Sequence, residues 1–73
     1  MKLSDLKIGG SCVVVSVTGD SAISRRLMEM GVVPGTAIRL VKEAPFGDPI
    51  EIELLGYHLA IRKSEAKSIE VKI

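Results

Sequence analysis

Four short segments of this chain alternate apolar and polar residues, and a fifth, residues 11–18, is rich in β-branched valine; both patterns are typical of β-strands. The clearest segment runs from Ile50 to Leu54, where three aliphatic residues alternate with Glu51 and Glu53. Successive strand side chains point to opposite faces, so this period of two separates a core face from a solvent face. The other segments are residues 11–18, 37–44, 57–62 and 69–73.

The same alternation predicts which side chains point inward. In the first segment we expect the valine phase, Val13, Val15 and Val17, to face the core. Cys12 then lies near the surface as a small filler, since free cysteine behaves as a small hydrophobe. The other residues expected to point inward are Leu3, Leu6, Ile38, Leu40, Ile50, Ile52, Leu54, Tyr57, Leu59, Ile61, Ile69, Val71 and Ile73.

Residues 19–31 change to a helical period. Ile23, Leu27 and Met30 fall at i, i+4 and i+7, which places them on one face of a helix. Gly31 follows as a residue able to take the left-handed conformation that ends helices. A helix this short is marginal by itself, so packing against the strands has to hold it.

Cap and turn residues divide the rest of the chain. Asp20 or Ser21 is expected to cap the helix, and Ser64 to cap a single later turn of helix. Pro34-Gly35 is typical of a type II turn. Together these patterns predict a mainly β fold: a small five-stranded barrel with one short α-helix inserted between strands one and two. Residues 1–73 form one domain.

Composition limits how this domain is held together and what it binds. The chain has one cysteine, so no intramolecular disulfide can form. One cysteine and one histidine are also too few ligands for a Cys/His zinc site. Aliphatic packing therefore has to hold the core together. A lone cysteine also fits a reducing cytosol. Ten basic and nine acidic residues give no electrostatic reason to expect nucleic acid. The longest purely apolar run, Cys12 to Val15, is too short to insert in a membrane.

The sequence carries no catalytic motif and only weak candidates for a metal site. Cys12 and His58 are a formal nucleophile–base pair, but no third group is indicated to orient them, so we expect no enzyme. Glu51, Glu53 and His58 are weak candidate ligands for a divalent transition metal such as iron or zinc. Alternating glutamates are more often the solvated face of a half-buried sheet, and no cofactor is expected to be required.

Two features point to contact with another protein. Arg25 and Arg26, with Arg62-Lys63, form either a basic patch or ordinary solvated charges. Phe46 lies in a loop bounded by prolines and a glycine. It either projects as an apolar contact or folds back over the barrel mouth, and aromatic residues are enriched at interface centres.

Three stretches together resemble the FeoA family, ferrous iron transport protein A. They are residues 26–36 (RLMEMGVVPGT), residues 44–52 (APFGDPIEI) and residues 56–66 (GYHLAIRKSEA). Phe46 stands where a leucine is more usual, which keeps the loop tip apolar. With the leucines near the N-terminus, the resemblance covers nearly the whole chain.

The resemblance implies an SH3-like barrel and a small cytoplasmic accessory of bacterial ferrous iron uptake. Its partner would be FeoB, a membrane transporter with a cytosolic G-protein domain, and self-association is compatible with this role. The exposed motif residues Arg25, Arg26, Phe46 and Asp48 are the candidate contacts. An alternative is a regulatory or metal-sensing module related to the C-terminal SH3-like domain of iron-dependent repressors. The length argues against it, since no room remains for a DNA-reading helix-turn-helix.

Overall fold

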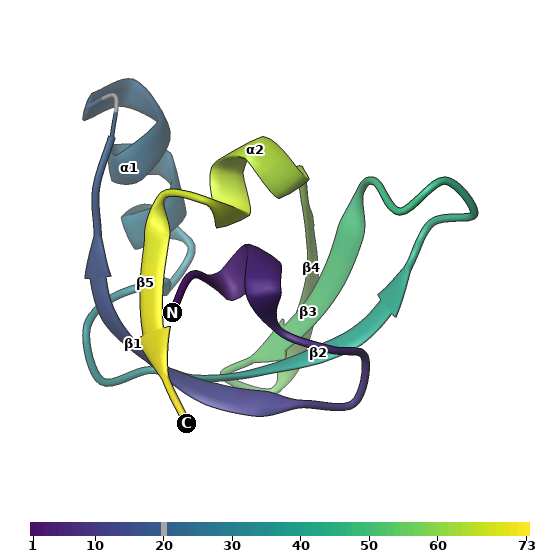
Figure 1. Cartoon of the computed structure of the whole chain (residues 1–73). Helices are drawn as coiled ribbons and strands as arrows, with labels where there is room; N and C mark the ends of the chain where they lie inside the picture. Colours follow the sequence, from purple (N-terminus) through teal and green to yellow (C-terminus); the bar gives the residue numbers. More distant parts are fainter. Residues whose placement is uncertain (20) are drawn as a thin grey trace.

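The computed structural model describes every residue of the chain except Asp20. Five antiparallel strands form one sheet in the order β4-β3-β2-β1-β5, which curls around a common core (Figure 1). One helix lies between β1 and β2, as the sequence predicts. The elements in chain order are η1 (Leu3–Asp5), β1 (Ser11–Val17), α1 (Ser21–Glu29), β2 (Ala37–Glu43), β3 (Ile50–Leu54), β4 (Tyr57–Ile61), α2 (Lys63–Ala66) and β5 (Ile69–Lys72).

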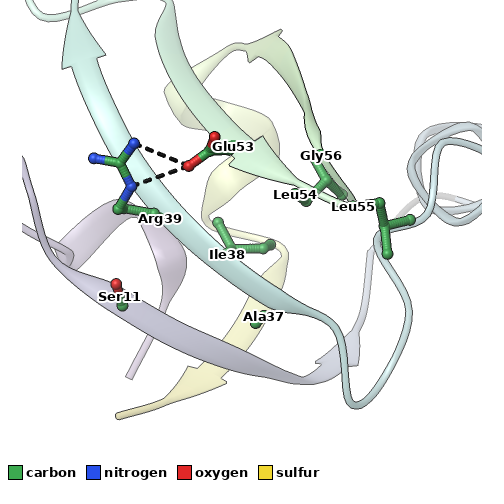
Figure 2. Close-up of a pocket in the computed structure, with 8 residues that line it drawn as sticks. All are labelled: Ser11, Ala37, Ile38, Arg39, Glu53, Leu54, Leu55 and Gly56. Carbon is green, nitrogen blue, oxygen red and sulfur yellow. Dashed lines mark hydrogen bonds and ion pairs between the residues drawn. The ribbon is translucent and has the colours of Figure 1, made fainter.

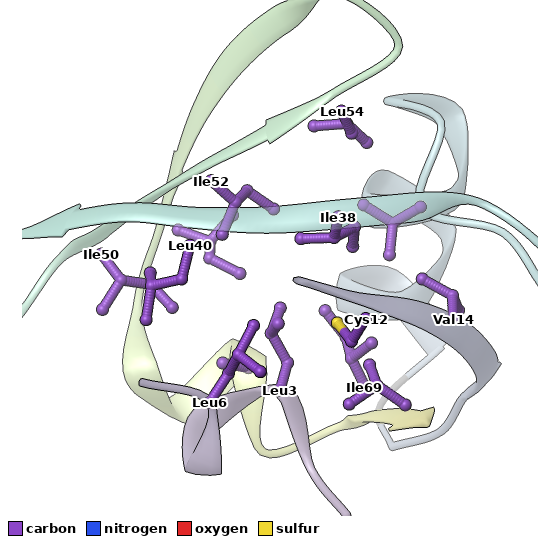
Figure 3. Packing of buried hydrophobic residues seen from close by; sticks show 14 of the residues in the cluster. Leu3, Leu6, Cys12, Val14, Ile38, Leu40, Ile50, Ile52, Leu54 and Ile69 are labelled. Carbon is purple, nitrogen blue, oxygen red and sulfur yellow. The ribbon is translucent and has the colours of Figure 1, made fainter. Parts of the chain in front are cut away.

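A single aliphatic cluster fills the space that the sheet encloses (Figure 3). Every strand contributes to it, and η1 and α1 add side chains from outside the sheet. Burying an aliphatic side chain of this size contributes about 1.5–3 kcal/mol, so this cluster is the main source of stability. The predicted core residues that are buried are Leu3, Leu6, Leu27, Ile38, Leu40, Ile50, Ile52, Leu54, Ile61, Ile69 and Val71.

Strand β1 contradicts the predicted valine phase. Cys12 and Val14 are buried, whereas Val15 is 44% exposed. A β-bulge explains the difference: Val14 pairs with Val71 and Ser16 with Glu70, so Val15 is an extra residue that faces no partner on β5. The bulge shifts the phase, and only Val17 of the predicted set packs against the core. The prediction that Cys12 lies near the surface was therefore wrong.

The sequence pattern also predicted that Tyr57 and Ile73, at the ends of strands, lie in the core, and this prediction was wrong. Tyr57 is exposed, because its hydroxyl donates a hydrogen bond to the carbonyl of Met30 and its ring lies outside the barrel. Ile73 is 90% exposed because it lies beyond the last residue of β5. Leu59 is partly buried against the core, as its phase predicts.

Helix α1 is fixed mainly at its C-terminal end. Leu27 is the one residue of the predicted stripe that is fully buried, and Ile23 is exposed. The amide of Gly31 donates to the carbonyl of Met28, and the amide of Val32 donates to that of Leu27. This is the Schellman arrangement, and it confirms Gly31 as the residue that ends the helix. The predicted caps, Asp20 and the side chain of Ser21, lie outside the described residues.

The first residues of the chain cover the outer edge of β5. Lys2 forms a β-bridge with Glu70, and the amide of Val71 donates to the carbonyl of Met1 at 2.8 Å. The terminal ammonium lies 2.7 Å from the Glu70 carboxylate. Hydrogen bonds from this ammonium and from Lys2 lower the pKa of Glu70. One edge of the sheet is thus closed by the chain itself, which removes a site for edge-to-edge aggregation.

Candidate functional site

The loop between β2 and β3 presents the most exposed aromatic side chain of the described residues. The amide of Ala44 donates to the carbonyl of Pro49 at 3.0 Å, and the amide of Gly47 donates to the carbonyl of Ala44 at 2.7 Å. These bonds close the loop on itself and leave Phe46 at its tip, 99% exposed. The alternative in which Phe46 folds back over the barrel mouth was therefore wrong.

The base of this loop is fastened to α2. The Asp48 carboxylate accepts a hydrogen bond from the amide of Lys63 at 3.0 Å, so it caps the start of that helix. The Lys63 ammonium lies 3.8 Å from the Glu43 carboxylate on the other side of the loop. Ser64 was predicted to cap this helix, and that prediction was wrong: the amide of Arg62 donates instead to the Glu65 carboxylate.

Of the two arginines predicted as contacts, one reaches α2 and the base of the same loop. Arg26 of α1 lies 3.8 Å from the Glu65 carboxylate of α2. Arg26 and Arg62 also line one hollow of about 280 Å³, together with Pro49 at the end of the loop. Arg25 is exposed on α1 but does not line this hollow. Arg26 and Asp48 thus both contact α2, whereas Phe46 lies at the exposed tip of the loop, on the side of the molecule away from α1 (Figure 1).

The weak metal candidates form a network of ion pairs on the outer face of β3 and β4. His58 Nδ1 lies 2.7 Å from a Glu51 oxygen, and His58 Nε2 lies 3.6 Å from a Glu53 oxygen. Arg39 donates two hydrogen bonds to Glu53, and Lys42 lies 3.7 Å from Glu51. The Arg39 guanidinium, by hydrogen bond and charge, lowers the pKa of Glu53.

This network does not have the form of a metal centre. Each carboxylate in it already has a cationic partner. Among the residues that the structure describes, no group of three or more His, Cys, Asp or Glu side chains is arranged to hold a metal ion. Glu51, Glu53 and His58 do lie together, as their sequence positions predict, but they form a hydrogen-bonded charge network.

A second hollow, of about 270 Å³, lies at the other end of β3 (Figure 2). The Arg39–Glu53 ion pair lies at one side of it and the turn at Leu55 and Gly56 at the other. Leu55 is exposed and has a positive φ of 51°. Sequence reasoning missed this residue. The signal available was the Leu-Gly pair between two alternating segments, since such short turns often need positive φ at both positions.

Nothing in the described structure assembles a nucleophilic site. Cys12 is buried in the core, and this burial raises the pKa of its thiol. His58 lies on the outer face of β4, where it contacts the glutamates. The formal Cys12–His58 pair is therefore not formed.

No helix in residues 1–19 and 21–73 is long and apolar enough to cross a bilayer.

Comparison with known proteins gives matches over the whole length of the chain. The family model of the FeoA domain matches residues 1–73. A fusion protein of Porphyromonas gingivalis, which joins an Fe(2+) transport protein A to an Fe(2+) transporter FeoB, is 37% identical over 73 residues. That match covers 100% of this chain but 9% of the fusion protein, so the chain corresponds to a small part of that relative.

Two solved structures share both the fold and much of the sequence. A FeoA protein of Chlorobium tepidum is 45% identical with a TM-score of 0.94, covering 100% of this chain and 70% of that chain. A Stenotrophomonas maltophilia FeoA, solved in complex with zinc, is 39% identical with a TM-score of 0.87, covering 99% and 89%. It is described as an SH3-domain protein, which confirms the SH3-like fold expected for this chain.

Proposed function

This chain belongs to the FeoA domain family, and from that membership we propose that it is a cytoplasmic accessory of ferrous iron uptake. In this proposal it binds the cytosolic part of an FeoB-type transporter and supports or regulates transport. It acts by contact and catalyses no reaction of its own. Ferrous iron is the cargo of the transporter and not a resident cofactor of this chain.

The observation that carries the proposal is the fusion protein of P. gingivalis. In that relative, a sequence 37% identical to this chain is joined covalently to an FeoB transporter. Linking two domains raises the effective concentration of each for the other, often to the millimolar range. Such a link favours partners that contact one another, which supports the same contact between separate chains.

The loop that carries Phe46 is the surface we assign to this contact. An aromatic side chain 99% exposed contributes nothing to the core, so its apolar area is available to a partner. Hydrogen bonds across the loop and from Lys63 to Asp48 fix the backbone before binding. A preorganised loop loses little conformational entropy on binding, which makes Phe46 a suitable anchor.

The zinc-bound relative does not extend this proposal to a metal. The S. maltophilia FeoA was solved with zinc. In this chain, the candidate ligands Glu51, Glu53 and His58 are engaged with one another and with Arg39 and Lys42. The residues present therefore do not fit a metal centre, and no step of the proposed function passes through one.

The decisive test is binding of the chain to the isolated cytosolic region of an FeoB transporter, by calorimetry, with no nucleotide, with GDP and with a non-hydrolysable GTP analogue. Phe46→Ala should weaken binding at least tenfold, which corresponds to about 1.4 kcal/mol. The matched control is Ile73→Ala, which removes an apolar side chain that is 90% exposed and lies outside the loop. Both variants should unfold at the wild-type temperature.

The outcomes separate the function from its site. If the wild-type chain binds in none of the three nucleotide conditions, the proposed function is wrong. If it binds and Phe46→Ala binds as tightly as Ile73→Ala, the function stands and the assignment of the loop is wrong.

A further inference from the structure

We propose that the hollow between α1, β4 and α2 is a recognition site for a carboxylate side chain of the protein partner. The identity of that partner rests on the proposed function, while the chemistry of the site rests on its own residues. The hollow measures about 280 Å³, which accommodates a glutamate or aspartate side chain.

Three elements that are distant in sequence build this hollow. Arg26 comes from α1, Arg62 follows β4, and Glu65 comes from α2. The remaining lining is apolar and consists of Pro49, Ala60 and Ile61. A hollow lined by two arginines beside apolar residues is suited to planar, bidentate recognition of a carboxylate.

The two arginines and one glutamate around the hollow have a net positive charge that one further anion can balance. One Glu65 oxygen accepts the Arg62 amide at 2.9 Å, and the other lies 3.8 Å from the Arg26 guanidinium. The Arg26 side chain is still 63% exposed, against 11% for Glu65. Within the described residues, the Arg62 guanidinium forms no ion pair. The hollow thus carries one uncompensated positive charge, which matches a single carboxylate.

The surroundings favour an acidic protein segment over a nucleic acid. The net charge of the whole chain is only +1, which does not provide the row of cations that a phosphate backbone requires. A neighbouring hollow of about 240 Å³, which includes Pro45, shares Pro49 and Ala60 with this one. It lies beneath the loop that carries Phe46. An extended segment with one acidic and one apolar side chain therefore fits the two hollows together.

The first arm of the test measures affinity for the cytosolic region of the FeoB transporter. Arg62→Gln and Arg26→Gln should each weaken binding about five- to tenfold, since each removes a charge-assisted hydrogen bond. Arg62→Lys should recover only part of this loss, because an ammonium cannot form the bidentate contact. Lys72→Gln is the control: it removes an exposed cation on β5 and should bind as the wild type does.

The second arm tests the hollow without the transporter. The chain is titrated, with ¹⁵N detection by NMR, with acetyl-Leu-Glu-Leu-amide and with acetyl-Leu-Gln-Leu-amide. The Glu peptide should shift the Ala60 and Ile61 amides and the Arg26 and Arg62 Nε–H signals, with a dissociation constant in the millimolar range. The Gln peptide, and Arg62→Gln with the Glu peptide, should give shifts at least fivefold smaller.

Each result decides a different question. Equal shifts with both peptides, or none with either, overturn the carboxylate site whether or not the transporter binds. Larger shifts with a ten-residue oligothymidylate than with the Glu peptide also overturn it, in favour of a nucleic-acid surface. Shifts specific to the Glu peptide, with no binding of the transporter, support the site and contradict the proposed function.

Discussion

Single residues with positive φ determine how the helix of this chain is joined to the sheet. Gly31 ends α1 with a φ of 101°, and a Cβ at this position would lie 2.5 Å from Leu55 Cδ1. Leu55 itself has positive φ, which is uncommon for a branched side chain. The two residues meet although they are far apart in sequence. The end of α1 and the turn between β3 and β4 are therefore fitted to one another at the level of individual atoms.

Comparing Gly31→Ala with Gly35→Ala distinguishes the cost of a strained backbone from the cost of a clash with Leu55. Gly35 has a φ of 93°, and a Cβ added there would meet no atom within 4 Å, so its substitution carries only the strain of left-handed backbone, about 1–2 kcal/mol. Gly31→Ala should destabilise slightly more, because Leu55 has to move as well. Thermal unfolding measures both, and the Leu55 methyl signals should shift in Gly31→Ala alone. Unchanged Leu55 methyls in that variant would contradict the contact.

At the scale of elements, the five strands, the helix between β1 and β2 and the later helical turn could be predicted from the sequence, but η1 and the bulge in β1 could not. Residues 12–15 are all apolar, so no polar residue marks which face is which. In β3, by contrast, Glu51 and Glu53 mark the solvent face, and the predicted phase is confirmed. An extra residue in a uniformly apolar strand reverses its inward face without leaving a sequence signal.

Val14→Ala and Val15→Ala test this bulge directly. Val14 is buried and Val15 half-exposed, although the two are adjacent and of one type. Val14→Ala should cost about 2 kcal/mol or more of the free energy of unfolding, and Val15→Ala less than about 0.5 kcal/mol. Urea denaturation gives both values. Equal losses would mean that β1 has no fixed inward face in solution.

Some features of the candidate site could be predicted from the sequence, and others could not. The prolines and glycine around Phe46 predict a loop at this position, but they leave open whether the ring projects or folds back over the barrel mouth. A basic patch that joins Arg26 to Arg62 was one of two alternatives, and the sequence could not decide between them because the outcome depends on how α1 packs beside α2. The role of Asp48 as a cap for α2 depends on the same packing, since fifteen residues separate it from Lys63.

The whole molecule has one core and no covalent cross-link, so its stability margin is narrow. A chain of 73 residues has a free energy of unfolding of about 4–11 kcal/mol by the usual value per residue. Cys12 lies inside this core, 4% exposed, with a thiol whose pKa is raised by burial. Ionisation of the thiol is thereby linked to unfolding of the entire domain.

This linkage predicts a loss of stability at alkaline pH. The folded pKa of Cys12 lies above its ordinary value near 9.0, so the protonated thiol contributes its full stability below that pH. The contribution is lost as the pH rises toward the folded pKa, because the unfolded chain ionises first. At pH 7 the wild type should be more stable than Cys12→Ala in urea, and by pH 10 this difference should narrow. A constant difference would show that the thiol does not titrate with unfolding.

The pairing of β1 with β5, and the bond from the Val71 amide to Met1, also have a consequence for how the molecule is made. A ribosome adds about 5–20 residues each second, so β1 leaves the exit tunnel seconds before its partner strand exists. Until residue 71 has emerged, the edge of β1 that pairs with β5 has unpaired backbone N–H and C=O groups. Folding therefore has to wait for the end of the pairing segment, and the nascent chain is the stage at which this domain most needs protection from aggregation.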